Sequence, residues 1–260
     1  MIDFVCKSRY NVDDFRRLVH LLRQKDGCPW DSVQTHDSIR DNFLEETYEV
    51  CEAIDTGDNA LLKEELGDVL MQVIFHASIE EDAGHFDLDD VADSACKKLI
   101  FRHPNLFSQE GSALSWDELK QQEKGYTTRT QTLDAVARSL PALWRARKVQ
   151  KRAAAAGFDW PDAAPTLDKV DEELDELRQA VDEQSNVEEE LGDLLFAVVN
   201  AARHLGIDPE RALNRASDKF ISRFAAMERI RPEDWRDLPA EELLELWRQA
   251  KAQQRHETKE

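Results

Sequence analysis

The sequence predicts an all-α protein built as a tandem duplication of one helical bundle unit. Glycine and proline, which favour turns, number only 9 and 8 among 260 residues, so long helices with few turns are expected. Apolar residues recur at helical spacing, as at Leu62, Leu66 and Val69, whereas the alternation typical of strands is hard to find. An ordered series of residues also occurs twice along the chain. Because 41% of the residues are apolar, the chain can bury a core.

The expected helices follow from this periodicity and from residues that cap helix ends. One helix is expected over 38–54, with Ser32 or Thr35 as its N-cap, and the next over 62–74. In the second half, a helix is expected over 167–181 with Thr166 as its N-cap, and another through 189–199. The stretch 108–132 contains the polar connector between the halves, and 126–132 within it is interpreted as linker.

Charge and cysteine content exclude several classes of function. Basic residues number 34 and acidic residues 54, so the net charge is −20, which repels both nucleic acid and anionic membranes. We therefore expect no nucleic acid partner and no membrane partner, whereas a small phosphorylated ligand is compatible if metal ions or local cations offset the charge. The four cysteines are widely spaced and the N-terminus has no apolar segment, which predicts a cytoplasmic protein without disulfides or a signal peptide.

The internal repeat consists of landmarks that keep their order in both halves. It predicts two units, residues 1–125 and 126–260, whose repeated parts lie near 10–124 and 138–252. The matching positions are Glu45/Glu172, Glu46/Glu173, Glu49/Glu176, Glu65/Glu190, Asp68/Asp193, Lys98/Lys219, Arg102/Arg223, Trp116/Trp247 and Lys120/Lys251.

Acidic residues carry the chemistry that the pattern predicts. Glu173 and Glu176 share one face of a helix, as do Glu190 and Asp193 on the next helix, because residues three apart are neighbours. Four carboxylates converge if the two helices pack antiparallel, and they repel one another unless a cation lies between them. Oxygen-only ligation suits Mg²⁺ or Mn²⁺. The first unit repeats the set as Glu46, Glu49, Glu65 and Asp68.

The alternative is that these acids form ordinary solvated helix faces, as most acidic pairs in so acidic a protein do. Two features argue against it. The helix with Asp193 continues into an apolar run, 194–199, so Asp193 is expected to be partly buried, where a carboxylate needs a partner. Gly67 and Gly192 each weaken a helix by about 1 kcal/mol relative to alanine, so a close approach of another backbone is expected there.

The duplicated pattern E-E-x-x-E followed by E-x-x-D resembles the MazG family of nucleoside triphosphate pyrophosphohydrolases. The resemblance spans nearly the whole chain and includes Gly27-Cys28-Pro29-Trp30-Asp31, Gln34-Thr35-His36, Arg102-His103-Pro104 and Gly157-Phe158-Asp159-Trp160. It implies MazG-like all-α bundles completed by dimerisation. It also implies Mg²⁺-dependent hydrolysis of nucleoside triphosphates between the α- and β-phosphates, a homodimer, and clearance of unwanted nucleotides in the cytoplasm.

The resemblance also assigns roles to individual residues. Glu173, Glu176, Glu190 and Asp193 correspond to metal ligands, with the first unit's set as a second site. Glu172 corresponds to the residue that orients or deprotonates the attacking water. The remaining positions correspond to substrate contacts: Lys169, Lys219, Arg223 and Lys251 to the phosphates and Trp247 to the base or ribose side. The sequence departs from the pattern at Asn105, where histidine is frequent, and Trp247 is equally compatible with a packing role.

Two other functions stay open: a helical scaffold or regulatory nucleotide-binding module without strong catalysis, and a phosphohydrolase that removes single phosphates. The sequence does not name a preferred base. Lys169 precedes Glu173 by one helical turn, whereas Asn42 holds that position before Glu46, so the second unit is expected to be the main centre. Apolar positions such as Leu194 and Val198 leave a helix face that a second chain is expected to cover.

Overall fold

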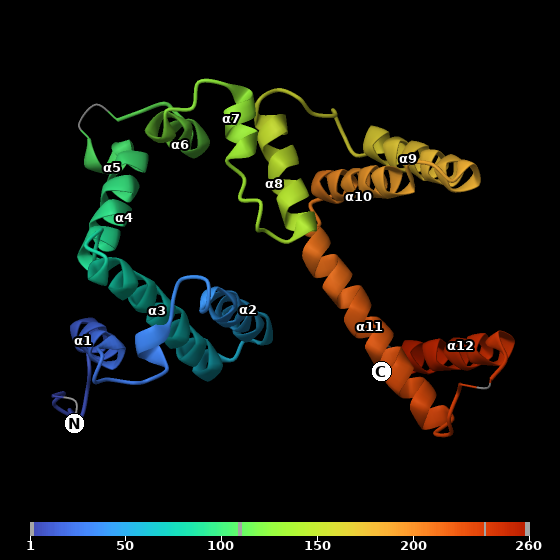
Figure 1. Ribbon diagram of the computed structural model, residues 1–260. Coiled ribbons are helices and arrows are strands. Elements are labelled where there is room, and N and C mark those ends of the chain that lie inside the picture. The colour runs from blue at the N-terminus through green and yellow to red at the C-terminus, as the bar shows by residue number, and fades with distance from the viewer. Residues whose placement is uncertain (1–2, 109–110, 237, 258–260) are drawn as a thin grey trace. The chain divides into compact units, whose positions relative to one another are not determined.

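Helices make up all the regular structure that the computed structural model describes, so the all-α prediction is confirmed. The structure describes residues 3–108, 111–236 and 238–257, with side chains only to 253 at the C-terminal end. The chain divides into two units, Met1–Lys124 and Gly125–Glu260 (Figure 1). Within the described ranges, no helix combines the length and the apolar character that crossing a membrane requires.

The first unit is organised around α3, its longest helix, against which α1, α2 and α4 pack, while α6 packs on α4. Its elements are α1 (Val12–Arg23), the short 3-10 helix η1 (Asp31–Val33), α2 (Arg40–Thr56), α3 (Asn59–Asp82), α4 (Leu88–Arg102), α5 (Pro104–Phe107) and α6 (Trp116–Lys124).

The second unit places α10 between α8 and α9, and α12 packs on α11. The contact between α9 and α10 is the most extensive of all helix contacts described (Figure 1). Its elements are α7 (Arg129–Asp134), α8 (Ala142–Ala155), α9 (Ala164–Glu183), α10 (Val187–His204), α11 (Pro209–Ile230) and α12 (Ala240–Glu257).

Each acidic helix pair is a tight hairpin, but the two turns differ. In the first unit, Gly57 takes the left-handed conformation (φ 72°), which glycine adopts without strain, and Asp58 caps α3 by accepting from the N–H groups of Ala60 and Leu61. In the second unit, Gln184 and Asn186 both have φ of 53°, a conformation that costs free energy in residues with a Cβ. The hairpin α9–α10 therefore depends more on the packing of its two helices.

Each unit contains one small cluster of buried apolar residues. In the first unit Val19, Ile39, Ile74 and Phe75 are buried together, so the residue before α2 is fixed against α1 and α3. In the second unit a cluster joins α11 to α12 and consists of Ala226, Met227, Leu246 and Ala250, with Trp235 and Trp247 packed against it.

Three local predictions were wrong. Helix α2 begins after Ile39 without a side-chain cap, so neither Ser32 nor Thr35 is its N-cap. Helix α9 begins three residues earlier than expected, and Thr166 lies buried in its first turn with its hydroxyl donating to the Ala163 carbonyl. The presumed linker, 126–132, contains the first turn of α7, which Thr128 and Gln131 start with a reciprocal capping box.

The mid-helix glycines do not mark a close approach within the described chain. A Cβ added to Gly67 or Gly192 would meet no atom within 4 Å. The expectation of a nearby backbone is therefore wrong for the single chain: Gly192 has no neighbour within 4 Å, and Gly67 lines an open cavity between α3 and α1.

Replacing Gly192 by alanine is expected to stabilise the second unit by about 1 kcal/mol, because alanine favours the helix and its methyl group meets no neighbour. Urea denaturation would measure the free energy of unfolding. Gly206→Ala is the matched control and is expected to destabilise, because Gly206 has a φ of 70°. A loss of stability in Gly192→Ala would contradict the prediction and would place atoms of a second chain at this position.

Candidate functional site

The hairpin α9–α10 brings three of the four predicted acids of the second unit together. Glu173 on α9 and Glu190 and Asp193 on α10 each offer a carboxylate oxygen, and these oxygens lie within 4.8 Å of one another. Because α9 and α10 are joined by a short turn, they run in opposite directions, and the i,i+3 pair on α10 faces Glu173 across the contact.

Glu173 is the buried member of this acid cluster. The residue is 6% exposed, and its Oε2 atom is buried without a hydrogen-bond partner among the described atoms. Its Oε1 atom lies 2.7 Å from Lys169 Nζ. A buried carboxylate oxygen without a partner is costly, so this position calls for a cation or a donor that enters from outside the chain.

The positions of Glu176 and Asp193 differ from the prediction. Glu176 lies outside the set of three, although burial and its contact with Glu173 raise the pKa of the Glu176 carboxyl. Asp193 is exposed, so the expectation of partial burial is wrong. The reason is that only one side of the apolar run after it is buried: Val199 is fully buried, whereas Leu195 is 49% and Val198 44% exposed.

The first unit has a corresponding cluster. Carboxylate oxygens of Glu46, Glu49 and Glu65 lie within 4.8 Å of one another, and Glu65 is buried. Burial, together with the charges of Glu49 and Asp68, raises the pKa of both Glu46 and Glu65. Asp68 therefore acts on this cluster through its charge, although it is not one of the three converging groups.

Lys169 is the clearest difference between the two clusters. Its ammonium lies 2.7 Å from Oε1 of Glu172 and 2.7 Å from Oε1 of Glu173, and these hydrogen bonds raise the pKa of Lys169. Lys169 therefore faces the acid cluster, as its spacing predicts, and also forms an ion pair with the Glu172 carboxylate. The corresponding residue of the first unit, Asn42, carries no charge.

Apart from Lys169 on α9, the predicted substrate contacts lie on another helix pair. Lys219 and Arg223 are on α11, and Trp247 and Lys251 on α12, where Lys219 and Lys251 are exposed. The Arg223 guanidinium stacks 5.5 Å from the Trp247 ring. The first unit repeats this geometry with Arg102, 5.3 Å from Trp116, although Arg102 also pairs with Glu123 at 2.6 Å.

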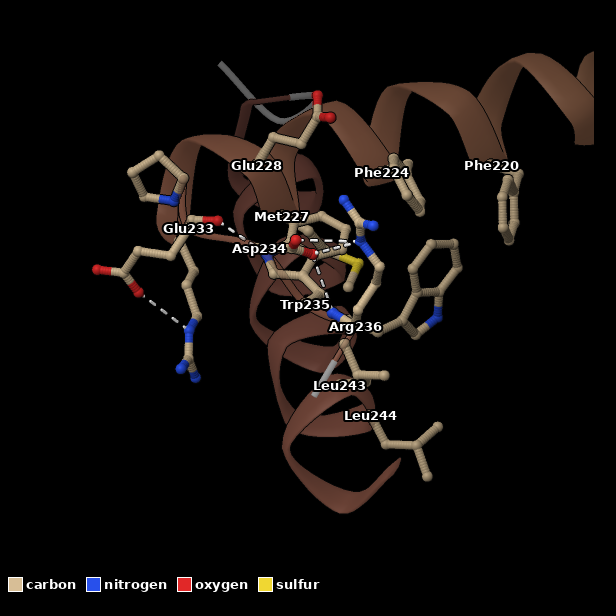
Figure 2. Close-up of a pocket in the computed structure, with 13 residues that line it drawn as sticks. Phe220, Phe224, Met227, Glu228, Glu233, Asp234, Trp235, Arg236, Leu243 and Leu244 are labelled. Atoms are coloured by element: carbon tan, nitrogen blue, oxygen red, sulfur yellow. Dashed lines mark hydrogen bonds and ion pairs between the residues drawn. The ribbon is translucent and has the colours of Figure 1, made fainter. Parts of the chain in front are cut away.

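Beside Trp247, residues of α11, of α12 and of the segment between them line an open cavity of about 730 Å³ (Figure 2). Phe220 and Phe224 project into its rim from α11, and the Phe220 ring lies 5.1 Å from that of Trp247. Arg231 and Arg236 pair with Glu233 and Asp234 at the other end. These aromatic residues were missed in the sequence, although the i,i+4 spacing of Phe220 and Phe224 directly after Lys219 would have indicated them.

A second contact that the sequence did not reveal anchors the loop before α9. Asp159, in the Gly157–Trp160 loop, accepts from Arg203 and lies 2.9 Å from Nε2 of His204, both on α10. The Arg203 hydrogen bond, helped by His204, lowers the pKa of Asp159 to about 2. This contact ties the start of α9 to the end of α10, and so supports the hairpin that carries the acids.

Comparison with known proteins agrees with the duplicated architecture. A family model described as the MazG nucleotide pyrophosphohydrolase domain matches the chain twice, over residues 34–107 and 164–226. These two segments contain α2–α3 and α9–α10, the helix pairs that carry the acid clusters.

Two curated relatives match over almost their whole length, and a third matches over about half of its length. The chain is 43% identical to a Thermotoga maritima protein named nucleoside triphosphate pyrophosphohydrolase/pyrophosphatase MazG, over 91% of this chain and 95% of that protein. It is also 43% identical to the Escherichia coli nucleoside triphosphate pyrophosphohydrolase, over 94% of this chain and 98% of the relative. Bacillus subtilis YabN is again 43% identical, and the match covers 95% of this chain and 53% of YabN.

Arg203→Gln is expected to raise the pKa of Asp159 from about 2 toward the ordinary value near 3.9, because it removes the hydrogen bond that lowers it most. The stabilisation from this contact is present above pH 4 and is lost as the pH falls toward 2. Carboxyl-carbon NMR shifts recorded against pH would measure it. Arg178→Gln, which removes an exposed pair with Asp175, is the control. An unchanged Asp159 titration in Arg203→Gln would refute the assignment.

Proposed function

Because this chain belongs to the MazG nucleotide pyrophosphohydrolase family, we propose that it hydrolyses nucleoside triphosphates to nucleoside monophosphate and pyrophosphate with Mg²⁺ or Mn²⁺. Two observations on the same residue carry the proposal: a carboxylate oxygen of Glu173 converges with those of Glu190 and Asp193, and its Oε2 atom is buried without a partner among the described atoms. The biological role would be clearance of unwanted nucleotides in the cytoplasm.

The donor set fits a hard divalent cation. It consists of carboxylate oxygens alone, which suit Mg²⁺ and Mn²⁺, and it lacks the histidine or thiolate ligands typical of zinc. Glu173, Glu190 and Asp193 would hold the ion, with Glu176 one turn further along α9. Glu46, Glu49, Glu65 and Asp68 would form the second site. The unpartnered Oε2 of Glu173 is the atom whose burial such an ion would offset.

When bound, the divalent ion supplies charge stabilisation to the phosphates and lowers the pKa of a bound water. Lys169, Lys219, Arg223 and Lys251 would bind phosphate oxygens. A phosphate that draws Lys169 away from Glu172 would leave the Glu172 carboxylate free to accept the proton of the attacking water. The water oxygen then bonds to the α-phosphorus, the bond from that phosphorus to the bridging oxygen breaks, and pyrophosphate leaves.

We further propose that the working unit is a homodimer. In one chain, the acids lie on α9–α10 with Lys169, whereas Lys219, Arg223 and Lys251 lie on α11–α12, which is a different helix pair. The faces around Leu195 and Val198 are half exposed, and an apolar helix face of this kind is stable when another helix covers it. A second copy would cover this face and would offer its own cations near the acids.

The nucleoside end of the substrate would lie at Trp247. Its ring contacts the Phe220 ring, tilted by 41° at 5.1 Å, and the Arg223 guanidinium at 5.5 Å, and it also lines the open cavity. Aromatic rings bind bases through their faces, which all bases share, so this site would tolerate several bases.

Glu173→Gln is expected to reduce pyrophosphate release from the second unit about a hundredfold, because it removes the buried ligand charge. Glu172→Gln is the matched variant next to it: turnover falls, whereas Mn²⁺ affinity stays, since Glu172 is outside the converging set. Both are measured in the background Glu65→Gln/Asp68→Asn, by product chromatography and by the Mn²⁺ paramagnetic resonance signal.

The products decide between the proposed function and its alternatives. Nucleoside monophosphate and pyrophosphate support it. Nucleoside diphosphate and phosphate would instead indicate an enzyme that removes single phosphates, and no turnover with intact Mn²⁺ binding would indicate a binding module. Equal loss of Mn²⁺ affinity in both variants would contradict the separate roles of Glu172 and Glu173.

The second unit is proposed as the main catalytic centre, because Lys169 adds a positive charge that Asn42 does not. Side-by-side knockouts, Glu65→Gln/Asp68→Asn and Glu190→Gln/Asp193→Asn, would test this by pyrophosphate release. The second pair is expected to lower activity ten- to a hundredfold more than the first pair, the range that one phosphate contact is worth. The reverse order would overturn the choice.

A further inference from the structure

Three histidines and one glutamate of the first unit form a contact chain outside the acid cluster. His36 lies in the segment before α2, His76 and Glu80 are on α3, and His85 follows α3. Nδ1 of His36 lies 2.7 Å from Nδ1 of His76, and Nε2 of His36 lies 2.6 Å from Oε1 of Glu80. Nδ1 of His85 lies 2.7 Å from the other Glu80 oxygen.

These groups are arranged in a line and not around a centre. Among the described residues, only the two acid clusters bring three ligand atoms within 4.8 Å of one another. A metal ion is therefore not the reason for this arrangement. The short contacts are hydrogen bonds, and since two imidazole nitrogens face each other, one of the two must lack a proton.

Counting protons shows which states keep the His36–His76 contact. With both rings neutral, His36 donates from Nε2 to Glu80 and His76 donates from Nδ1 to Nδ1 of His36. With one proton added, His36 donates in both directions, to Glu80 and to His76. With two protons added, both Nδ1 atoms carry hydrogen at 2.7 Å, and two positive rings stacked 5.0 Å apart repel each other.

The surroundings of the pair favour zero or one proton. Hydrogen bonds from His85 and His36 lower the pKa of Glu80, so its carboxylate stays ionised beside His36. Burial and the nearby His36 charge lower the pKa of His76. The Phe43 ring of α2 covers His76 at 5.6 Å. Among the charged groups on neighbouring elements, Arg23 pairs with Asp82, Arg16 with Asp87 and Asp89, and Arg40 with Asp41, while His20 contacts Gln24 and Asp37 follows His36 directly.

We propose that His36 and His76 form a pH-sensitive clasp that holds residues 34–39 and the start of α2 on α3, and that a second proton opens it. The clasp spans 40 residues of sequence, and Ile39, which is buried against α1 and α3, lies between His36 and α2. Opening it would loosen the helix that carries Glu46 and Glu49. The clasp needs no catalysis, so its test is independent of the proposed function.

The second unit holds the loop before its own acid hairpin by different chemistry. There, Asp159 accepts from Arg203 and His204, so a proton added to His204 strengthens the contact. Only protonation of Asp159, whose pKa is lowered to about 2, would open it. Mild acid is therefore expected to act on the first unit and to leave the second unit closed.

The coupling between proton binding and folding gives the direction and the size of the pH effect on the clasp. His76 has a lowered pKa in the folded unit, so the clasp contributes its full stability above the unfolded value of about 6.5 and loses stability as the pH falls below it. One extra proton bound by the open state raises the opening constant up to about tenfold per pH unit. Glu46 and Glu65 also take up protons in acid, with the opposite effect, and a comparison of variants at each pH removes this contribution.

Hydrogen exchange of the full chain between pH 7.5 and 5, read by mass spectrometry, tests the clasp. The variant His76→Phe keeps a flat ring against Phe43 and cannot titrate, and His36→Gln, at a half-exposed position, removes the facing imidazole. His20→Gln is the control, because His20 contacts Gln24 and not the clasp. Peptides within 34–56 report on the clasp, and peptides within 157–183 report on the second unit.

Relative to His76→Phe and His36→Gln, wild type and His20→Gln are expected to lose protection in 34–56 by up to about tenfold per pH unit below 6.5, with 157–183 unchanged. The same pH dependence in wild type and in both clasp variants would overturn the proposal. A pH response of 157–183 equal to that of 34–56 would also overturn it.

Discussion

Carboxylates that two packed helices force together are the constraint on which the rest of each unit depends. Two unit charges about 4 Å apart repel by roughly 4 kcal/mol at an effective dielectric near 20, so the acid hairpins oppose their own packing unless charge is removed or offset. Burial and mutual repulsion raise the pKa of Glu46 and Glu65 in the first unit, while Lys169 lies against Glu173 in the second. In the first unit, the buried cluster that includes Ile39 and Ile74 holds the hairpin against this repulsion. In the second unit, the contact of Asp159 with Arg203 supports it.

Duplication kept the acids and changed what supports them. The first hairpin turns through Gly57 without strain, and the second turns through Gln184 and Asn186 with two left-handed residues. The loop before the hairpin is fixed by paired histidines in one unit and by Asp159 with Arg203 in the other. The two acid sites are therefore equal in ligand type but differ in local stability and in their response to protons.

Helical spacing and the repeat were sufficient to predict the fold class and that acids of two neighbouring helices meet, because both depend on residues a few positions apart. They did not show which three of the four predicted acids converge in each unit. The Arg–Trp stacking in both units shows that the repeat was also aligned in the right register. Burial was not predictable in the same way: Asp193 is exposed because its apolar neighbours are left uncovered in a single chain. The contacts His36–His76 and Asp159–Arg203 join residues that are 40 and 44 positions apart in the sequence, and no local pattern indicates such pairs.

If the acids bind metal as proposed, the same repulsion determines whether the metal or the triphosphate binds first. Around Glu173 the carboxylates outnumber the one ammonium that contacts it, Lys169, and a triphosphate adds about four more negative charges to a chain that already carries −20. Phosphate would therefore be repelled until divalent ions occupy the acids. The cations of α11 and α12 cannot replace those ions, because they lie on a different helix pair from the acids. Metal binding would thus come first, and the cations of α11 and α12 would bind the phosphates after the metal has offset the negative charge of the acids.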